Sequence, residues 1–236
     1  MPKKVEKFIS SPRDALIWSV LLSLAIWFLP GFSWVMAPLL YLNTHIHELC
    51  HAIATLATGG NVGRIEVYAG GSGVTLTQGG IRIIISSAGY VGASLVGSYL
   101  VASSANRKSA RTALLAVAVT LGIGLGIWLR GDLVGVISAV AWIVALSLVL
   151  RNLSAAWITF SCQFLGIQQC LMSVQALLVL WKVTSIPGLQ NDALNASEII
   201  PFPPVMWAIA WLLFSLVAMG ASLRRVWSVR ASSPGE

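Results

Sequence analysis

The residues best suited to chemistry lie in one short segment, which reads Asn43-Thr44-His45-Ile46-His47-Glu48-Leu49-Cys50-His51-Ala52. On a helix, His47 and His51 project from one face, so they can take adjacent positions on a tetrahedral zinc ion. Glu48 lies beside them, within reach of a water molecule on the metal. This HExxH pattern predicts a zinc site for hydrolysis, with Glu48 as the general base.

Two neighbouring residues have other predicted roles. His45 points about 200° away from His47 around the helix, so we expect it to hydrogen-bond to a neighbouring helix and not to bind the same metal. Cys50 lies on the side of the two histidines, where a thiolate can in principle join the metal. A small packing side chain is the favoured interpretation of Cys50.

A catalytic zinc ion needs a third protein ligand and one open position for water. The chain has only three histidines, so we expect one of its eight carboxylates to be this ligand. Asp132 follows Arg130 at a tight turn and is interpreted as a local ion pair. Asp192 precedes the last apolar run, in an irregular segment of the kind that is buried or lines a cavity at membrane depth. We predict Asp192 as the ligand and Glu198 as the reserve, while a solvated helix cap is the alternative role of Asp192.

The composition indicates that a lipid bilayer surrounds the elements that position this site. Hydrophobic residues make up 57% of the chain and charged residues 10%, against about 25% charged in soluble domains. Seven apolar runs reach or approach the roughly 20 residues that span a bilayer. These runs are 15–29, 34–57, 83–104, 112–129, 133–150, 153–181 and 205–222. The sequence therefore predicts an all-α polytopic membrane protein with six or seven transmembrane helices, in a single domain over residues 1–236.

Three segments organise this predicted domain. The HExxH helix is expected over residues 34–57, and alternating polar and apolar residues with glycine turns predict a small β-hairpin in the segment 62–85. An interrupted segment over 183–204 precedes the last span. Small residues at helical spacing predict close helix packing in two of the runs. They are Ala88, Gly89, Gly92, Ala93 and Gly97 in one run and Gly122, Gly124 and Gly126 in the next.

The net charge of +7 at pH 7 comes mainly from basic clusters that flank the apolar runs. The clusters are Lys3, Lys4, Lys7 and Arg13, then Arg107, Lys108 and Arg111, and finally Arg224, Arg225 and Arg230. Such clusters are typical of anchors at the cytoplasmic lipid surface. No basic face is interleaved with stacking aromatic residues, so we expect the lipid bilayer, and no nucleic acid, as their partner.

The basic start of the chain predicts a cytoplasmic amino terminus. The run at 15–29 would then lead outside, and the HExxH run would return inside near Thr58. His51 precedes Thr58 by seven residues, which places the metal about 10 Å from that helix end, toward the cytoplasmic side. Seven full crossings would leave Arg224 and Arg225 outside, against the positive-inside tendency, so one run is expected to be re-entrant.

Several motifs occur in a characteristic order. They are His47-Glu48-Leu49-Cys50-His51-Ala52 in a span, then Thr58-Gly59-Gly60, Gly71-Ser72-Gly73-Val74-Thr75 and Ser87-Ala88-Gly89. This series resembles the site-2 protease family of intramembrane zinc metallopeptidases, especially its short bacterial branch. The resemblance implies that His47, His51 and a distant aspartate, here Asp192, bind Zn2+ in a bacterial inner (cell) membrane protein. Two positions depart from the family pattern, since Cys50 replaces a usual glycine and Ala193 follows Asp192 where glycine is usual.

Together these features predict an intramembrane zinc metalloprotease that cuts membrane-embedded proteins, with single-span proteins as expected substrates. Zinc-bound water would attack the peptide carbonyl, and Glu48 would carry the proton to the leaving amine. The resemblance implies that an edge of the hairpin binds the substrate as an added strand. Asn43, Asn152 and Gln163 are candidates for stabilising the oxyanion, although polar contacts between helices are favoured for each.

The alternative function is a membrane transporter or ion-binding protein that uses His47, His51 and Asp192 without hydrolysis. Transporters of this kind have two similar halves or paired broken helices. The sequence has one such break, near 187–204, which favours the protease.

Overall fold

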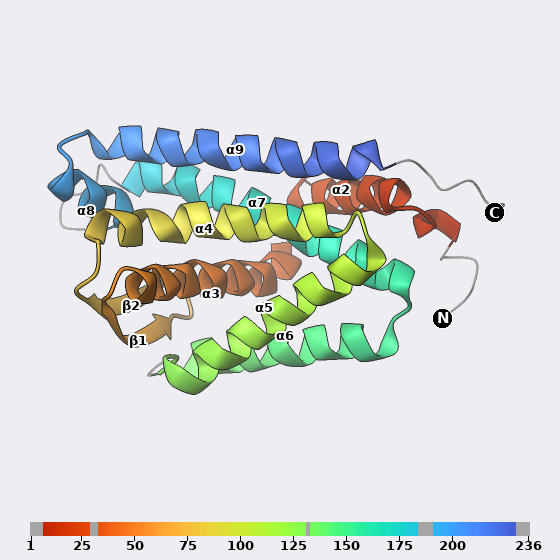
Figure 1. Ribbon diagram of the computed structural model, residues 1–236, viewed down its shortest axis with the longest axis horizontal. Helices are drawn as coiled ribbons and strands as arrows, with labels where there is room; N and C mark the ends of the chain where they lie inside the picture. Colours follow the sequence, from red (N-terminus) through yellow and green to blue (C-terminus); the bar gives the residue numbers. More distant parts are fainter. Residues whose placement is uncertain (1–6, 29–32, 131–132, 184–190, 230–236) are drawn as a thin grey trace.

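The computed structural model describes residues 7–28, 33–130, 133–183 and 191–229 (Figure 1). Asp132 and residues 184–190 of the interrupted segment therefore lie outside the described residues. The elements in chain order are η1 (Lys7–Ile9), α2 (Pro12–Phe28), α3 (Ser33–Ala57), β1 (Asn61–Val67), β2 (Gly73–Gln78), α4 (Arg82–Ser103), α5 (Arg107–Ile127), α6 (Leu133–Asn152), α7 (Ala155–Val183), α8 (Asp192–Ile199) and α9 (Pro204–Ser228).

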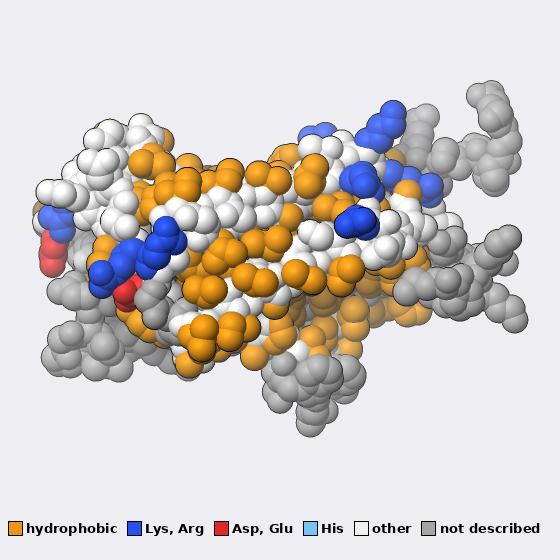
Figure 2. All heavy atoms as spheres, turned by 90° about the horizontal axis from the view of Figure 1, so that it is seen from below, with side chains coloured by type: hydrophobic (Ala, Val, Ile, Leu, Met, Phe, Trp, Pro, Cys, Tyr) orange, Lys and Arg blue, Asp and Glu red, His pale blue; other side chains and the backbone are white. Residues whose placement is uncertain are grey.

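The long helices coincide with the predicted apolar runs. Within the described residues, five of them, α4, α5, α6, α7 and α9, are long and apolar enough to cross a membrane. α2, with 17 residues, and α3, which carries the polar HExxH segment, are not among these five. Hydrophobic side chains cover the middle of the face seen in Figure 2, and basic side chains lie toward its two ends. The predicted class, an all-α polytopic membrane protein with one small hairpin, is confirmed.

α4 is the centre of the bundle and packs against α3, α7, α8 and α9. Glycine lets α4 approach α7 closely, because a Cβ on Gly97 would lie 2.9 Å from the carbonyl oxygen of Gly166 on α7. The close packing predicted for this run is therefore confirmed. In α5 the prediction holds only for Gly124, which faces Leu49, since Gly122 and Gly126 face open space.

α2 does not run alongside the other helices. Gln163 Nε2 on α7 donates to the Pro12 carbonyl at 2.8 Å, and Trp27 Nε1 donates to Gln168 Oε1 at 2.9 Å. The two α2 residues are about 22 Å apart along their helix, whereas the two glutamines are about 7.5 Å apart along theirs. α2 therefore crosses α7 steeply, which differs from the full crossing predicted for residues 15–29.

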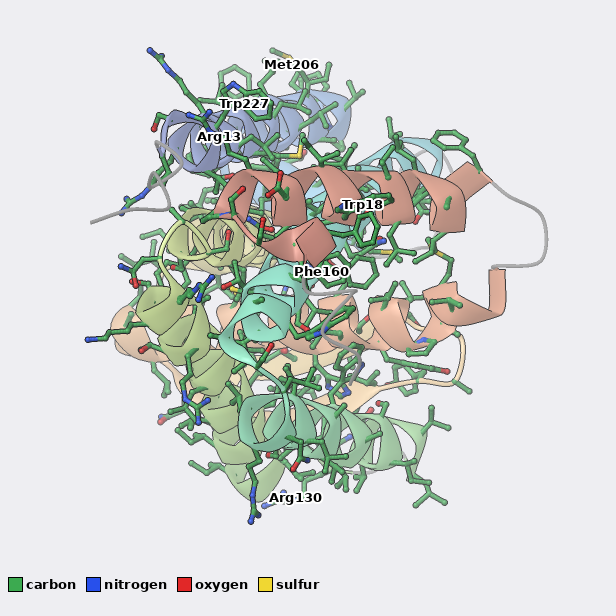
Figure 3. The ribbon with its side chains drawn as sticks, turned by 90° about the vertical axis from the view of Figure 1, so that its right-hand side faces the viewer. Arg13, Trp18, Arg130, Phe160, Met206 and Trp227 are labelled. Atoms are coloured by element: carbon green, nitrogen blue, oxygen red, sulfur yellow. The ribbon has the colours of Figure 1, made fainter. Side chains whose placement is uncertain are left out.

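The bundle has two distinct ends (Figure 1). The first turn of α2 and the last turn of α9 meet at one end, where the Arg13 guanidinium lies 5.7 Å from the centroid of the Trp227 ring (Figure 3). The hairpin and α8 lie at the opposite end. The first described residues are thus separated from the hairpin by the length of the bundle.

The hairpin starts where glycines end α3. The Gly60 amide donates to the Thr55 carbonyl at 2.8 Å, and Gly59 has a φ of 81°, in the left-handed region that favours glycine. β1 and β2 pair antiparallel from Asn61↔Gln78 to Val67↔Gly73. The predicted hairpin segment of 62–85 extends too far, because its last residues form the first turn of α4.

Candidate active site

α3 and α8 bring the three predicted metal ligands together. His47 and His51 project from the same face of α3, and their Nε2 atoms are 3.0 Å apart. Asp192, at the first turn of α8, places Oδ2 at 3.1 Å from His47 Nε2 and 3.2 Å from His51 Nε2. These are the His, Cys, Asp and Glu side chains that form a potential metal site among the described residues.

The geometry of this cluster fits a zinc ion. Ligand atoms at about 2.0–2.1 Å from a tetrahedral zinc are about 3.3 Å apart, close to the three observed separations. The donor set, two imidazoles and one carboxylate, is one that catalytic zinc sites use, and it leaves a fourth position free. Three lone-pair donors that face one another this closely need a cation or a proton between them, so the residues present fit a metal.

α4 fixes the orientation of the histidines. His51 Nδ1 lies 2.7 Å from the Ile85 carbonyl oxygen, so this nitrogen donates and Nε2 keeps its lone pair. Gly89 lies directly behind the cluster, because a Cβ there would come within 2.3 Å of His47 Nε2 and 2.5 Å of His51 Nε2. The helix can approach the two rings only because residue 89 has no side chain.

β2 holds Glu48 beside the cluster. Thr75 Oγ1 donates to Glu48 Oε2 at 2.7 Å and also lies 3.0 Å from the Glu48 carbonyl oxygen. Gly73 leaves room for this carboxylate, since a Cβ there would lie 2.7 Å from Glu48 Oε1. Thr44 Oγ1 fastens the turn of the hairpin to α3 by donating to the Gly71 carbonyl at 2.6 Å. The strand thus positions the predicted base.

Asp192 is held by local structure and by charge. Asn191 caps α8 by accepting a hydrogen bond from the Leu194 amide at 3.1 Å, and Ala193 and Ala196 are fully buried behind the helix. Burial raises the pKa of the Asp192 carboxyl, but the neighbouring imidazoles lower it by more, so its net pKa lies below the usual value. The carboxylate is therefore charged and ready to bind a cation.

The chain matches the Peptidase M50B-like family over residues 17–222, a region that includes the HExxH helix and Asp192. It belongs to the Peptidase M50B-like family. This membership confirms the resemblance to the site-2 protease family and makes the protein a member of a peptidase family. Comparisons with curated proteins and with solved structures gave no match.

The candidate active site of this M50B-like chain opens into a cavity of about 640 Å³. Its walls come from α3, the hairpin, the start of α4 and α8, and they include Glu48, Thr75, Arg82, Tyr90 and Asn195. The Tyr90 ring stands edge-on to His47, with centroids 4.6 Å apart, and stacks on Trp211 of α9 at 5.4 Å. α9 thereby supports the His47 ring through Tyr90.

Other candidate residues from the sequence lie apart from the cluster of His47, His51 and Asp192. His45 Nε2 lies 2.8 Å from Ser138 Oγ on α6, which confirms its predicted contact with a neighbouring helix. Cys50 packs against Gly92 on α4. Glu198, the reserve ligand, forms an ion pair with Arg82 at 3.1 Å on the surface.

The three oxyanion candidates also differ in position. Asn43 is buried on the cavity wall, where its Oδ1 accepts a hydrogen bond from Gln169 at 2.7 Å. Gln163 is buried against α2 through its bond to Pro12, and Asn152 is exposed at the far end of α6. Of the three, only Asn43 lines the cavity. Its side-chain oxygen is already used in the hydrogen bond to Gln169 on α7, so it serves contact between helices.

Sequence reasoning did not identify Thr75, Ile85 or Tyr90 as part of the site. Thr75 comes two residues after Gly73 and Tyr90 directly follows Gly89, and a polar residue this close to a glycine that permits close approach is a signal that sequence alone carries. The Ile85 carbonyl contributes through its backbone, so its residue type gives no signal.

Proposed function

We propose that this protein is an intramembrane zinc metalloendopeptidase in which His47, His51 and Asp192 bind the metal and Glu48 is the general base. The observation that carries the proposal is the meeting of three ligand atoms 3.0–3.2 Å apart, beside a carboxylate held by Thr75. Membership in a peptidase family supports hydrolysis over simple ion binding.

Each residue has a defined task in this reaction. Bound zinc would lower the pKa of a coordinated water to about 7 and polarise the substrate carbonyl. Glu48 accepts the proton of the attacking water on its carboxylate and then donates it to the nitrogen of the leaving amine. Thr75 keeps Glu48 Oε2 in a fixed position by its 2.7 Å hydrogen bond, so the second oxygen, Oε1, is available for proton transfer.

The hairpin supports substrate binding by strand addition, with single-span membrane proteins as the substrates. The outer edge of β1 is already occupied, because Ile65 exchanges backbone hydrogen bonds with Trp128 at 2.9 Å and with Arg130 at 3.1 Å. β2 has β1 as its only strand partner among the described residues, and it lines the cavity through Gly73, Val74 and Thr75. An extended peptide added to β2 therefore lies next to the candidate metal site.

The decisive experiment compares wild-type protein with Glu48→Gln. Both proteins should bind one zinc ion, measured on protein purified without a metal-affinity tag. Only the wild type should cut members of a panel of single-span proteins, since loss of general-base catalysis commonly costs 10²- to 10⁴-fold. Wild-type protein that binds no added zinc would refute the proposal. Loss of metal from Glu48→Gln, with no cleavage by wild type, would favour the ion-binding alternative.

A further inference from the structure

In the proposed reaction a negative charge develops on the carbonyl oxygen of the substrate. As the water oxygen bonds to the carbonyl carbon, one electron pair of the C=O double bond moves onto this oxygen, and a hydrogen-bond donor fixed in advance would stabilise it. The hydroxyl donors described so far are already used within the protein. Thr75 donates to Glu48, and Thr44 donates to the Gly71 carbonyl. The donor must therefore come from another part of the cavity wall.

Tyr90 of α4 brings an unused donor to this wall. The residue lines the cavity, and its hydroxyl has no hydrogen-bond partner among the described residues. The buried polar side-chain atoms that lack a partner do not include this oxygen, so it remains accessible. A phenol keeps its proton at neutral pH and can donate it in a hydrogen bond. Tyr90 therefore offers a donor that the fold itself does not use.

The direction of the Tyr90 side chain follows from the helix that carries it. Long side chains on an α-helix lean toward the amino-terminal end of that helix. α4 begins at Arg82, beside α8 and the hairpin (Figure 1). The carboxylates of Asp192 and Glu48 both act electrostatically on the Tyr90 hydroxyl, which agrees with this direction. The hydroxyl thus lies near both the third ligand and the base.

Two aromatic contacts hold the Tyr90 ring. Its plane stands at 86° to the His47 ring, with centroids 4.6 Å apart, and at 15° to the Trp211 ring, with centroids 5.4 Å apart. Trp211 is itself buried between the helices. A ring supported on two sides leaves its hydroxyl little freedom, and a donor fixed in advance needs no reorganisation when the charge develops.

We propose that the Tyr90 hydroxyl donates a hydrogen bond to the carbonyl oxygen of the substrate and stabilises the oxyanion that forms there. This inference rests on the proposed function. The Tyr90 proton stays on the phenol throughout the reaction. When the C–N bond breaks, the electron pair on the oxyanion re-forms the C=O double bond, and Glu48 delivers the proton taken from water to the leaving nitrogen. Glu48 thus moves the proton, and Tyr90 stabilises the charge.

Tyr90→Phe tests the hydroxyl alone, because it keeps the ring between His47 and Trp211. Loss of one oxyanion donor commonly lowers kcat 10²- to 10³-fold, and we expect a fall of about 10²-fold. KM should change little, because the hydrogen bond is stronger in the transition state than in the bound substrate. Zinc affinity should equal that of wild type. Tyr99→Phe is the matched control, since it removes a hydroxyl from the same helix at a side chain that is 53% exposed.

A second measurement does not require cleavage. A blocked phosphinic analogue of dialanine carries a charged oxygen on tetrahedral phosphorus where the peptide has its planar carbonyl, so it resembles the oxyanion. Its binding to the full-length, zinc-loaded protein is measured by titration calorimetry in detergent. Tyr90→Phe should weaken this binding about 10- to 100-fold, which is the effect of losing a hydrogen bond to a charged group. Tyr99→Phe should bind the analogue like wild type.

The outcomes distinguish the role of Tyr90 from the proposed function. If wild type cleaves and Tyr90→Phe behaves like Tyr99→Phe in both measurements, the protease stands and the role of Tyr90 is wrong. Loss of zinc from Tyr90→Phe also overturns this role, because the hydroxyl would then serve the metal site.

If wild type cleaves no member of the single-span panel, the protease is rejected and binding of the phosphinic analogue decides the role of Tyr90. Weaker binding by Tyr90→Phe than by Tyr99→Phe would keep Tyr90 as the donor to a charged oxygen at this site. Equal binding by the two variants, or no binding by wild type, would overturn it.

Discussion

Replacement of Gly89 by alanine offers a direct test of how α4 shapes the metal site. The new Cβ would lie 2.3 Å from His47 Nε2 and 2.5 Å from His51 Nε2, whereas ordinary contact begins near 3.4 Å. One or both rings must therefore retreat by roughly 1 Å, several times the ~0.2 Å tolerance of metal–ligand distances. We expect zinc affinity to fall at least as far as on loss of an outer-shell partner, about 10- to 100-fold, or roughly 1.4–2.7 kcal/mol.

The measurement is competition for zinc against a chelator of known affinity, on purified protein in detergent. Gly122→Ala is the matched control, because its Cβ meets no atom within 4 Å and it is also a glycine-to-alanine change inside a helix of the bundle. Thermal unfolding of the metal-free proteins checks that both variants are folded. If folded Gly89→Ala binds zinc as tightly as Gly122→Ala, the histidines do not form the metal site that α4 encloses.

Three further predictions concern the ligands and the base. Asp192→Ala should weaken zinc binding by more than the 10- to 100-fold typical of an outer-shell change, whereas Glu198→Ala should bind zinc like wild type. The opposite result in a chelator titration would transfer the ligand role to Glu198. Thr75→Val should keep zinc but lower kcat roughly tenfold, because loss of the hydrogen bond that orients Glu48 should raise the activation free energy by about 1.4 kcal/mol. An unchanged kcat would contradict this role of Thr75. Removal of zinc with EDTA should increase hydrogen exchange in α8 more than in α3, measured by mass spectrometry, and equal protection with and without metal would show that α8 does not depend on the ion.

The HExxH helix and the hairpin follow from local features of the sequence. The predicted helix, 34–57, agrees with α3 at Ser33–Ala57, because a continuous apolar run ends at Gly59 and Gly60. The four-residue spacing of His47 and His51 places both on one face whatever surrounds the helix. Glycines and alternating polarity around 64–77 likewise indicate a turn between two short strands.

Interactions between distant segments could not be predicted in the same way. The bond from Thr75 to Glu48 and the bond from His51 to the Ile85 carbonyl depend on how β2 and α4 pack against α3. Asp192 was found by elimination among few carboxylates, since nothing local fixes its position beside the histidines. The direction of α2 was missed because an apolar run indicates burial in lipid and gives no angle to its neighbours.

The separation of His47 and Asp192 along the chain, 145 residues, also has a consequence for biosynthesis. At about 5–20 residues per second, the ribosome needs roughly 7–30 s to pass from the first ligand to the third. Until then a growing chain inserted in the membrane has Glu48, the proposed base, but only two of the three residues of the candidate metal site. With the proposed function, such a protein stays inert beside other nascent membrane proteins until Asp192 has been synthesised and has packed against α3.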